Sequence, residues 1–235
     1  MIKDKGFLAI IPARGGSKGV PRKNIRLLNG IPLIGHTLME AKKSKYLNRV
    51  IVSTDDEEIV KISRQFNGEV PCLRPKELAK DTSPTIDSII HIINYLKEKE
   101  NYLPDYICLL QCTSPLRTYE DIDGAIEKLL YTDFDGIISV CEVEVNPYWT
   151  NVFEKDKLKY FIEEGKNITR RQDLPKVYRY NGAIYIIKTD ILMDIKSFET
   201  ENITGYIMSN EDSIDIDTIT DFKIAEILMK ERERI

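Results

Sequence analysis

Four cationic side chains stand in one short glycine-rich stretch of this sequence, IPARGGSKGVPRKN, which contains no acid. They are Arg14, Lys18, Arg22 and Lys23. Backbone N–H groups in a glycine-rich loop between a strand and a helix bind phosphate, and nearby Lys and Arg add charge. A solvated turn is the plain alternative, because glycines form turns readily. Like charges this close repel unless an anion lies among them, so the stretch indicates a phosphate-binding loop.

The spacing within this loop excludes two familiar phosphate motifs. A Walker A loop needs GK followed by Ser or Thr, whereas Lys18 is followed by Gly19 and Val20. A dinucleotide fingerprint needs GxGxxG, whereas here the glycines are Gly15, Gly16 and Gly19. A long basic loop that is stiffened by Pro21 suits a triphosphate, whose diphosphate leaving group needs its charge neutralised.

A second candidate is the stretch SIDIDT, in which Asp215 and Asp217 alternate with Ile214 and Ile216. This spacing places both carboxylates on one face of an extended segment. Two carboxylates beside a triphosphate predict a magnesium site. The alternative is a helix cap, with Asp217 or Thr218 as the cap of the last helix.

Two further stretches carry candidate binding residues. In LLQCTSPLR, Gln111 follows a buried strand and is expected at the ligand-binding edge, with Pro115 and Arg117 fixing the loop. In RRQDLPKVYRYNGAIY, Arg170, Arg171 and Arg179 form a second cationic group. Guanidinium binds carboxylate in a bidentate manner, so this group suits a second substrate that carries a carboxylate.

The elements that must position these residues follow from the hydrophobic pattern. Through the first 140 residues, short apolar runs alternate with segments of helical spacing, which predicts parallel βαβ units and a doubly wound, mostly parallel α/β sheet. Ligands of such sheets bind at the carboxyl ends of the strands. The loops that follow Ile11, Ser53, Leu110 and Cys141 are expected to meet there.

The alternation breaks after Cys141. Residues 142–180 are polar, contain scattered aromatics and lack clear periodicity, which predicts an excursion from the sheet that includes a short hairpin. A strand is expected to resume at Gly182. We therefore expect one domain over residues 1–235 with an inserted element at 142–180.

Composition restricts the class of protein. The formal net charge is −4 and no long basic tract occurs, which argues against nucleic acid as a partner. No apolar run has the length of a membrane span or a signal peptide, so no membrane partner is expected and a cytoplasmic location is predicted. The cysteines Cys72, Cys108, Cys112 and Cys141 form no CxxC pair, which favours reduced thiols over disulfides or a zinc site.

These motifs, together with LIGHT, IVSTDD and LRPKELAKDTSPT, resemble the CMP-sialic acid synthetases, also called acylneuraminate cytidylyltransferases, along essentially the whole chain. The resemblance implies a nucleotidyltransferase fold of Rossmann-like type with a small protruding dimerisation element, and hence a homodimer. It implies that CTP and a nonulosonic acid give a CMP-sugar and diphosphate, by in-line attack of the anomeric hydroxyl on the α-phosphate. Mg²⁺ is the implied cofactor.

The resemblance also implies a role for individual residues. The triphosphate would be held by Arg14, Lys18, Lys23 and Asn24, the cytosine would lie at Arg74, and Gln111 would lie between nucleotide and sugar. Arg171 would bind the sugar carboxylate, Asn181 and Tyr185 would line the sugar pocket, and Asp215 and Asp217 would bind magnesium. The residues expected to act on the reacting phosphate are Arg14, Lys23, Gln111 and Asp217.

The chain departs from the N-acetylneuraminate enzymes at two positions. Trp149 stands where some of them have lysine, and Phe198 is followed by Glu199 where they have a Phe pair. Both aromatics are expected to face an acylated or deoxygenated part of the sugar, because aromatic faces favour methyl and acetamido groups. A legionaminate-like sugar therefore rivals N-acylneuraminate as the substrate.

Two other classes of function compete. A dinucleotide-dependent oxidoreductase is disfavoured by the missing fingerprint. A non-catalytic sugar-nucleotide-binding module would keep the basic loop, but it would not need Asp215 and Asp217. The two aspartates therefore favour an enzyme.

Overall fold

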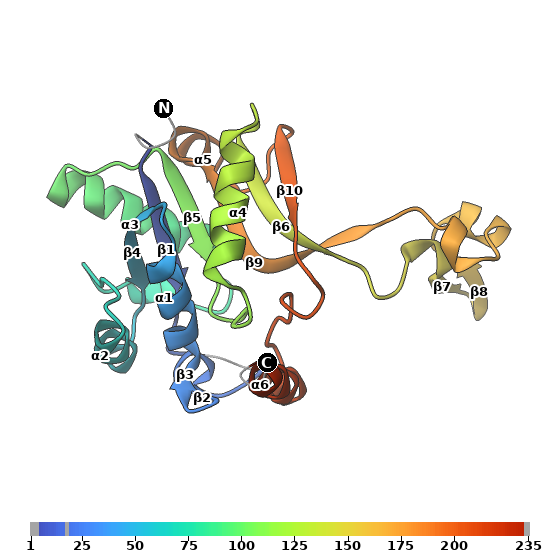
Figure 1. Cartoon of the computed structure of the whole chain (residues 1–235), viewed down its shortest axis with the longest axis horizontal. Helices are drawn as coiled ribbons and strands as arrows, with labels where there is room; N and C mark the ends of the chain where they lie inside the picture. Colours follow the sequence, from blue (N-terminus) through green and yellow to red (C-terminus); the bar gives the residue numbers. More distant parts are fainter. Residues whose placement is uncertain (1–4, 17–18, 233–235) are drawn as a thin grey trace.

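The computed structural model describes residues 5–16 and 19–232, and its centre is a six-stranded sheet of order β10-β6-β9-β5-β1-β4 (Figure 1). Strand β9 runs antiparallel to both of its neighbours, and the remaining strand pairs are parallel. The sheet strands are β1 (Phe7–Pro12), β4 (Leu47–Ser53), β5 (Tyr106–Leu110), β6 (Gly136–Glu142), β9 (Tyr178–Lys188) and β10 (Ile203–Ile207). The predicted mostly parallel α/β fold is confirmed.

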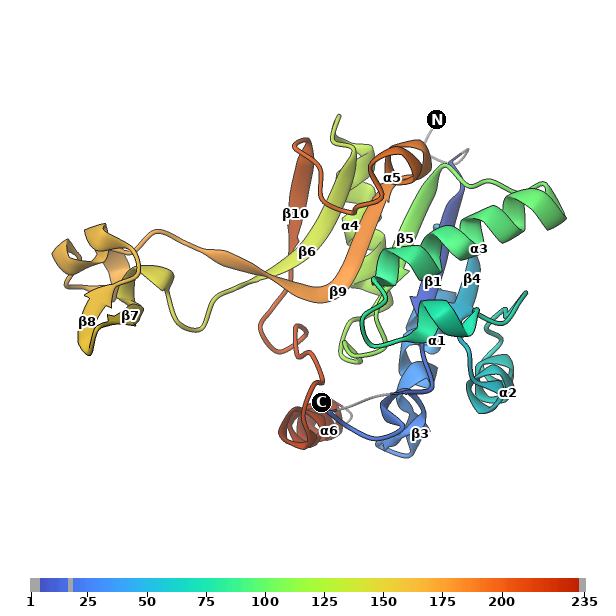
Figure 2. The ribbon, with the colours of Figure 1, turned by 180° about the vertical axis from the view of Figure 1, so that it is seen from behind.

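Helices cover both faces of the sheet, as the alternating pattern requires. Helices α1 (Leu33–Lys43) and α4 (Tyr119–Leu130) lie on the face toward the viewer in Figure 1. Helices α3 (Thr85–Glu100) and α5 (Thr189–Ile195) lie on the opposite face, which Figure 2 presents. Successive residues of a strand point to opposite faces, so a single strand such as β1 supplies Ala9 and Ile11 to one buried cluster and Leu8 and Ile10 to the other.

Residue caps fix where two helices begin at the carboxyl edge of the sheet. The carboxylate of Asp56 accepts hydrogen bonds from the first N–H groups of α2 (Glu57–Gln65). Thr118 and Asp121 form a reciprocal capping box at the start of α4. Such caps satisfy N–H groups that have no partner within the helix, so the loops that precede both helices are held in one conformation.

A third, smaller apolar cluster lies beyond the carboxyl edge. It joins α6 (Ile219–Arg232) to the short hairpin of β2 (Leu27–Leu28) and β3 (Ile31–Pro32). Ile216 is fully buried in this cluster and Ile214 packs against it, so the alternation of Ile and Asp in SIDIDT has the predicted consequence. The apolar residues hold the segment down while the aspartates point elsewhere.

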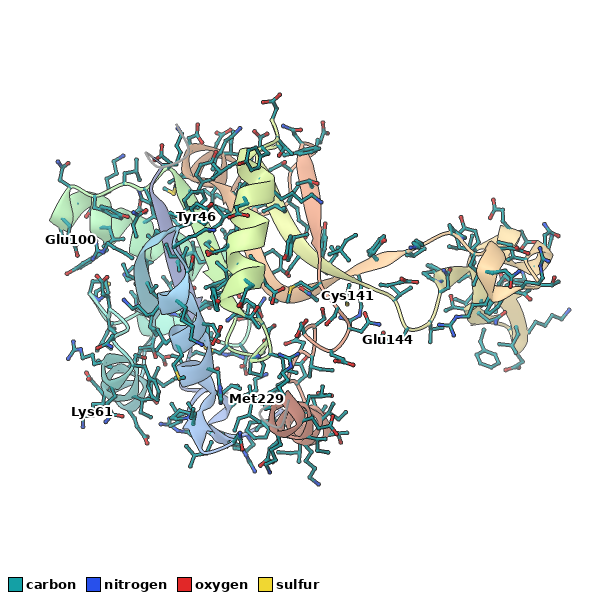
Figure 3. All side chains as sticks on the ribbon, in the orientation of Figure 1. Tyr46, Lys61, Glu100, Cys141, Glu144 and Met229 are labelled. Carbon is teal, nitrogen blue, oxygen red and sulfur yellow. The ribbon has the colours of Figure 1, made fainter. Side chains whose placement is uncertain are left out.

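Residues 143–177 form an arm that projects from the end of the sheet (Figures 1 and 2). Its tip carries the antiparallel hairpin of β7 (Asn151–Glu154) and β8 (Lys157–Tyr160). Figure 3 shows Cys141 and Glu144 where the arm leaves the body. Glu144 accepts a hydrogen bond of 3.0 Å from Arg179 across the two strands, and this contact lowers the pKa of the Glu144 carboxyl.

The arm agrees with the predicted excursion, with one difference at its end. Strand β9 begins at Tyr178, not at Gly182, and its first residues pair with the end of β6. The register between β6 and β9 shifts opposite Gly182, whose φ is +78°. A glycine tolerates that conformation, so the strand bends there and continues out into the arm.

Two sequence expectations about the rest of the chain can be compared with the structure. No helix among residues 5–16 and 19–232 is long and apolar enough to cross a membrane. All four cysteines are free thiols, three of them buried.

Candidate active site

A pocket opens at the carboxyl edge of the sheet, where the loops after β1 and β5 meet the segment that runs from α2 to the start of α3. It gathers residues that are far apart in the sequence. Its lining consists of Pro12, Arg14, Gly16, Lys23, Asn24, Arg74, Thr85, Gln111, Cys112 and Thr113. Five of the predicted site residues, Arg14, Lys23, Asn24, Arg74 and Gln111, therefore share one pocket.

The basic loop is held against the body at several points. The N–H of Gly15 donates to the carboxylate of Asp55 (3.0 Å), and the side-chain amide of Asn24 donates to the carbonyl of Arg14 (2.9 Å). A Cβ at Gly19 would lie 2.2 Å from the carbonyl oxygen of Asp217, so only glycine fits this close approach. Lys18, which the sequence places among the triphosphate ligands, lies outside the described residues.

Acids from other parts of the chain meet three of the four cations of the loop. Arg14 pairs with Asp81 at 2.8 Å, and Lys23 pairs with Asp217 at 3.2 Å. Arg22 pairs with Asp56 and Glu58 at the start of α2. The sequence shows no acid within the loop, but the fold supplies acids that offset the repulsion among its cations.

Arg74 is almost completely buried beside this pocket. Its side chain donates to the hydroxyl of Ser53 (3.1 Å) and to the carbonyl of the same residue (2.6 Å). Burial lowers the pKa of the guanidinium, with Asp55 opposing the shift and Arg14 adding to it. Because arginine stays protonated even so, the pocket contains a rigid cation and hydrogen-bond donor.

Asp215 lies next to the pocket residue Thr113. Burial raises the pKa of Asp215, the nearby charge of Asp217 raises it further, and the Thr113 hydroxyl opposes the shift. The oxygen Oδ1 of Asp215 is buried and has no hydrogen-bond partner among the described residues. A buried carboxylate oxygen without a partner is costly, so this site favours an additional positive or donor group.

Asp217 faces solvent and is linked to the basic loop. Besides its contact with Asp217, the ammonium of Lys23 donates to the carbonyl of Ile216 (2.6 Å). The cap of α6 is formed by Thr218 and Asp221, because the side chain of each accepts a hydrogen bond from the backbone N–H of the other. The Asp217 carboxylate is therefore not used as a cap.

A cluster of three aromatic side chains includes Tyr185, which lies near Asp215. The ring of Tyr185 packs edge-on against Tyr180 and Phe198, with centroid distances of 6.5 and 5.8 Å. Burial raises the pKa of Tyr185, and the charge of Asp215 raises it further. Tyr185 and Phe198 thus pack against each other, and Tyr185 lies within the electrostatic reach of Asp215.

Asn181 is buried, with only 1% of its surface exposed. Its amide donates to Ser213 (2.8 Å) and accepts from Ser139 (2.5 Å). In this arrangement the amide bonds to protein atoms, so Asn181 acts on the site by holding the segment that leads to Asp215.

Trp149 and Arg171 lie together, but on the arm. Both border a pocket at the base of the arm, with Glu142, Asn146 and Lys176 among its other lining residues. The indole N–H of Trp149 donates to the carbonyl of Ile168 (2.9 Å). Neither residue lines the pocket of Arg14 and Gln111. Within one chain, the predicted sugar contacts are therefore divided between the body and the arm.

Comparison with known proteins identifies the family. A cytidylyltransferase family model matches residues 8–233. The chain belongs to the cytidylyltransferase family. Its similarity extends over nearly the whole length of both proteins for several members, and over about half the length of the N-acylneuraminate cytidylyltransferases of Streptococcus agalactiae.

Three comparisons describe the range of similar proteins. A post-translational flagellin modification protein B of Campylobacter coli is 38% identical over 96% of this chain and 96% of its own. A CMP-N,N'-diacetyllegionaminic acid synthase of Legionella pneumophila is 35% identical over 95% of this chain and 96% of its own. A solved CMP:2-keto-3-deoxy-manno-octonic acid synthetase in complex with CTP has a TM-score of 0.72 at 17% identity, covering 97% of this chain and 99% of that one. At this identity the structural likeness shows the fold alone.

Some residues of this cytidylyltransferase site were not foreseen. Asp55 and Asp81 anchor the basic loop, and Thr85 lines the pocket from the first position of α3. The first two lie in IVSTDD and LRPKELAKDTSPT, so their presence near the site was indicated. Their pairing with this loop was not, because contacts across the fold leave no spacing signal in the sequence.

Proposed function

We propose that this cytidylyltransferase converts CTP and a nonulosonic acid to the CMP-sugar and diphosphate. One observation carries the proposal: Arg14, Lys23, Arg74 and Gln111 share a pocket at the carboxyl edge, with the Asp215–Asp217 segment joined to Lys23. A non-catalytic binding module would not need that pair of carboxylates beside the phosphate loop.

The residues divide the work by position. Arg14, Lys23 and Asn24 hold the triphosphate, and Lys18 adds charge from the same loop. Arg74, fixed by its two bonds to Ser53, binds the cytosine. Phosphoryl-type transfer depends mainly on positioning and on neutralising charge, so a rigid cationic pocket supplies most of what the reaction needs.

Gln111 and Tyr185 orient the attacking sugar. Gln111 directly follows β5 and lines the pocket. Tyr185 belongs to the neighbouring strand β9 and lies near Asp215. A sugar held between them presents its anomeric hydroxyl to the α-phosphorus in line with the departing diphosphate. The cations of the basic loop stabilise the charge that develops on that diphosphate.

The donor set fits a magnesium ion. Asp215 has a buried oxygen without a partner, and Asp217 keeps its carboxylate in solvent. The described residues contain no group of three or more His, Cys, Asp or Glu that could hold a metal, so an ion here would depend on the two carboxylates and on substrate phosphates. We propose that Asp215 and Asp217 hold Mg²⁺, which would supply Lewis-acid neutralisation of the triphosphate.

We propose a sugar that carries two acetamido groups, of the N,N'-diacetyllegionaminate type. Similar proteins include CMP-N,N'-diacetyllegionaminic acid synthases and pseudaminic acid cytidylyltransferases, and also N-acylneuraminate cytidylyltransferases. The aromatic faces of Phe198 and Trp149 favour acetamido and methyl groups over the hydroxyls of a glycerol tail. Arg171 binds the carboxylate that all these sugars share.

We further propose that the enzyme is a cytoplasmic homodimer in which the arm of one copy completes the site of the other. The support is the division of the sugar contacts, because Trp149 and Arg171 lie on the arm while Tyr185 and Phe198 lie on the body. The arm also exposes large apolar side chains, among them Phe153, Leu158 and Phe161. Exposed apolar groups of this kind mark protein interfaces.

The test is release of diphosphate from CTP with a panel of nonulosonic acids. The parent enzyme should use N,N'-diacetyllegionaminate or a related diacetamido sugar with higher kcat/KM than N-acetylneuraminate. Trp149→Lys should shift the preference toward N-acetylneuraminate, and Arg171→Ala should abolish the use of every sugar. A parent that prefers N-acetylneuraminate by a wide margin, with the same ratio in Trp149→Lys, contradicts the proposed sugar but leaves cytidylyl transfer intact.

A further inference from the structure

Arg117 is a cation sealed inside the protein beside the active site. Only 1% of its surface is exposed, and no carboxylate among the described residues forms a hydrogen bond with it. The thiols of Cys108 and Cys112 lie near it, but burial raises the pKa of each to about 12, so they are neutral at physiological pH. Burying a charge in this way is unfavourable unless its contacts have a use.

The contacts of Arg117 are concentrated on one nitrogen. Its Nη1 donates to the carbonyl of Gln111 (3.1 Å) and to the carbonyl of Ala183 (2.9 Å). Its Nε and Nη2 are buried and have no hydrogen-bond partner among the described residues. A residue that served packing alone would be replaced by an apolar side chain without the cost of these unpaired donors.

The two carbonyls belong to the two halves of the proposed site. Gln111 follows β5 and lines the nucleotide pocket, whereas Ala183 follows the bend of β9 at Gly182 and precedes Tyr185. One guanidinium therefore joins the strand end that faces the nucleotide to the bend that leads to the sugar contacts.

The loop between Gln111 and Arg117 also touches the aspartate segment. The carbonyl of Thr113 accepts from the N–H of Ile216 (2.8 Å), and the Thr113 hydroxyl is close enough to Asp215 to lower the pKa of its carboxyl. Next to it, a Cβ placed on Gly182 would lie 3.8 Å from the hydroxyl of Ser114 and 3.6 Å from Asp215. Arg117 closes this loop, because its own N–H bonds the carbonyl of Ser114 (3.4 Å).

We propose that Arg117 is a positioning residue for cytidylyl transfer, whose guanidinium holds the carbonyls of Gln111 and Ala183 together and so fixes the spacing between the nucleotide and the sugar. It touches neither substrate. The proposal rests on the proposed function, because the spacing matters only if two substrates must meet in line. Small misplacements of reacting groups lower rates strongly, and the unpaired donors are the cost of the alignment.

The experiment compares Arg117→Met with Arg117→Lys. Arg117→Met keeps most of the volume and removes the buried charge, so its melting temperature should equal or exceed that of the parent. Its kcat should nevertheless fall at least tenfold, while KM for CTP changes less than threefold, because Arg14, Lys23 and Arg74 remain in place. Arg117→Lys, which can still donate to both carbonyls, should recover part of kcat.

The matched control is Arg232→Met. Arg232 donates to the carbonyl of Leu116 (3.0 Å) in the same loop from the more exposed side, and it pairs with Asp212. Its loss should leave kcat within about twofold of the parent, since it does not join the two halves of the site.

Two results would overturn the proposal. One is a folded Arg117→Met with parental kcat. The other is an activity loss in Arg117→Met or Arg117→Lys that only follows the folded fraction. The same holds if Arg117→Lys is fully active while Arg117→Met does not fold. An inactive parent with every sugar acid would instead contradict the proposed function, so the two failures are distinguishable.

Discussion

At the scale of single residues, two adjacent cations of the basic loop have different surroundings. Arg22 has a φ of 55° and turns its guanidinium to Asp56 and Glu58, outside the pocket. Lys23 turns into the pocket, with its ammonium on the Ile216 carbonyl and Asp217. The sequence shows four similar charges. Only the direction of the backbone makes Arg22 an anchor of the loop and turns Lys23 toward the ligand pocket.

Substitution of these neighbours should therefore separate stability from activity. Lys23→Met should lower kcat/KM about a hundredfold, the size of losing one preorganised electrostatic contact. Arg22→Met should lower the unfolding free energy by about 1 kcal/mol, because its two exposed ion pairs are each weak, and should leave kcat/KM nearly unchanged. Steady-state kinetics and denaturant unfolding of both variants check this. A destabilised but fully active Lys23→Met would contradict it.

Asp217 tests the magnesium assignment at the same scale. Asp217→Asn keeps the shape of the side chain and removes its charge, so turnover should fall at least about a hundredfold. Thr218 and Asp221 cap α6 without it, so the melting temperature should change little. Rates are measured as a function of Mg²⁺ concentration. A near-parental rate of the variant at low Mg²⁺ would remove Asp217 from the metal site.

At the scale of elements, the cap of α2 connects helix stability to the position of the basic loop. Asp56 accepts from the N–H groups of Glu58 and Ile59 and from Arg22. The hydrogen bond from Arg22 holds the pKa of Asp56 below its ordinary value, with the two backbone bonds acting in the same direction. Loop and helix are thus stabilised by one ionised carboxylate.

The pH dependence of stability follows from this direction. A carboxylate whose pKa is lowered in the folded state stabilises the protein fully above its unfolded pKa of about 3.9. This stabilisation is lost as the pH falls through the folded-state pKa. Asp56→Ala should cost about 1 kcal/mol at neutral pH, and the difference from the parent should shrink below about pH 4. Urea unfolding at several pH values measures both. A difference that is independent of pH would contradict the charged cap.

Element prediction from the sequence succeeded where periodicity was strong and failed where it was absent. The apolar runs of β1, β4 and β5 and the helical spacing of α1 and α4 belong to the alternating pattern that predicted the sheet. The first residues of β9 were assigned to the excursion, because residues 142–180 are polar, contain scattered aromatics and lack clear periodicity. Their strand pairing depends on β6, which the local pattern cannot reveal.

At the scale of the whole molecule, the arm determines which residues one chain can bring together. The nucleotide residues were predictable, because the carboxyl ends of parallel strands converge at one edge. The partners Asp55 and Asp81 and the bond from Arg117 to the Ala183 carbonyl were not, because they depend on contacts between distant segments. Trp149 and Arg171 were predicted as sugar contacts, and in one chain they line a pocket on the arm and not the pocket at the carboxyl edge.

The proposed dimer predicts complementation between two inactive variants. Arg171→Ala removes an arm residue and Asp217→Asn removes a body residue, so a mixed dimer keeps one site with both residues intact. After unfolding and refolding of an equal mixture, about a quarter of parental activity should return, because half of the dimers are mixed and each has one working site. Light scattering should give the mass of a dimer. A monomeric mass, or no recovered activity from mixed dimers, would contradict the shared site.

The identity of the product decides whether the enzyme transfers a cytidylyl group from CTP to a nonulosonic acid. The parent enzyme is incubated with CTP, Mg²⁺ and N,N'-diacetyllegionaminate, and the products are separated and weighed by mass spectrometry, with diphosphate measured in parallel. We expect one CMP ester of the sugar acid for each diphosphate released, and no reaction when CTP or the sugar acid is left out. Diphosphate formed without a CMP-sugar, or no reaction with any nonulosonic acid, would contradict it.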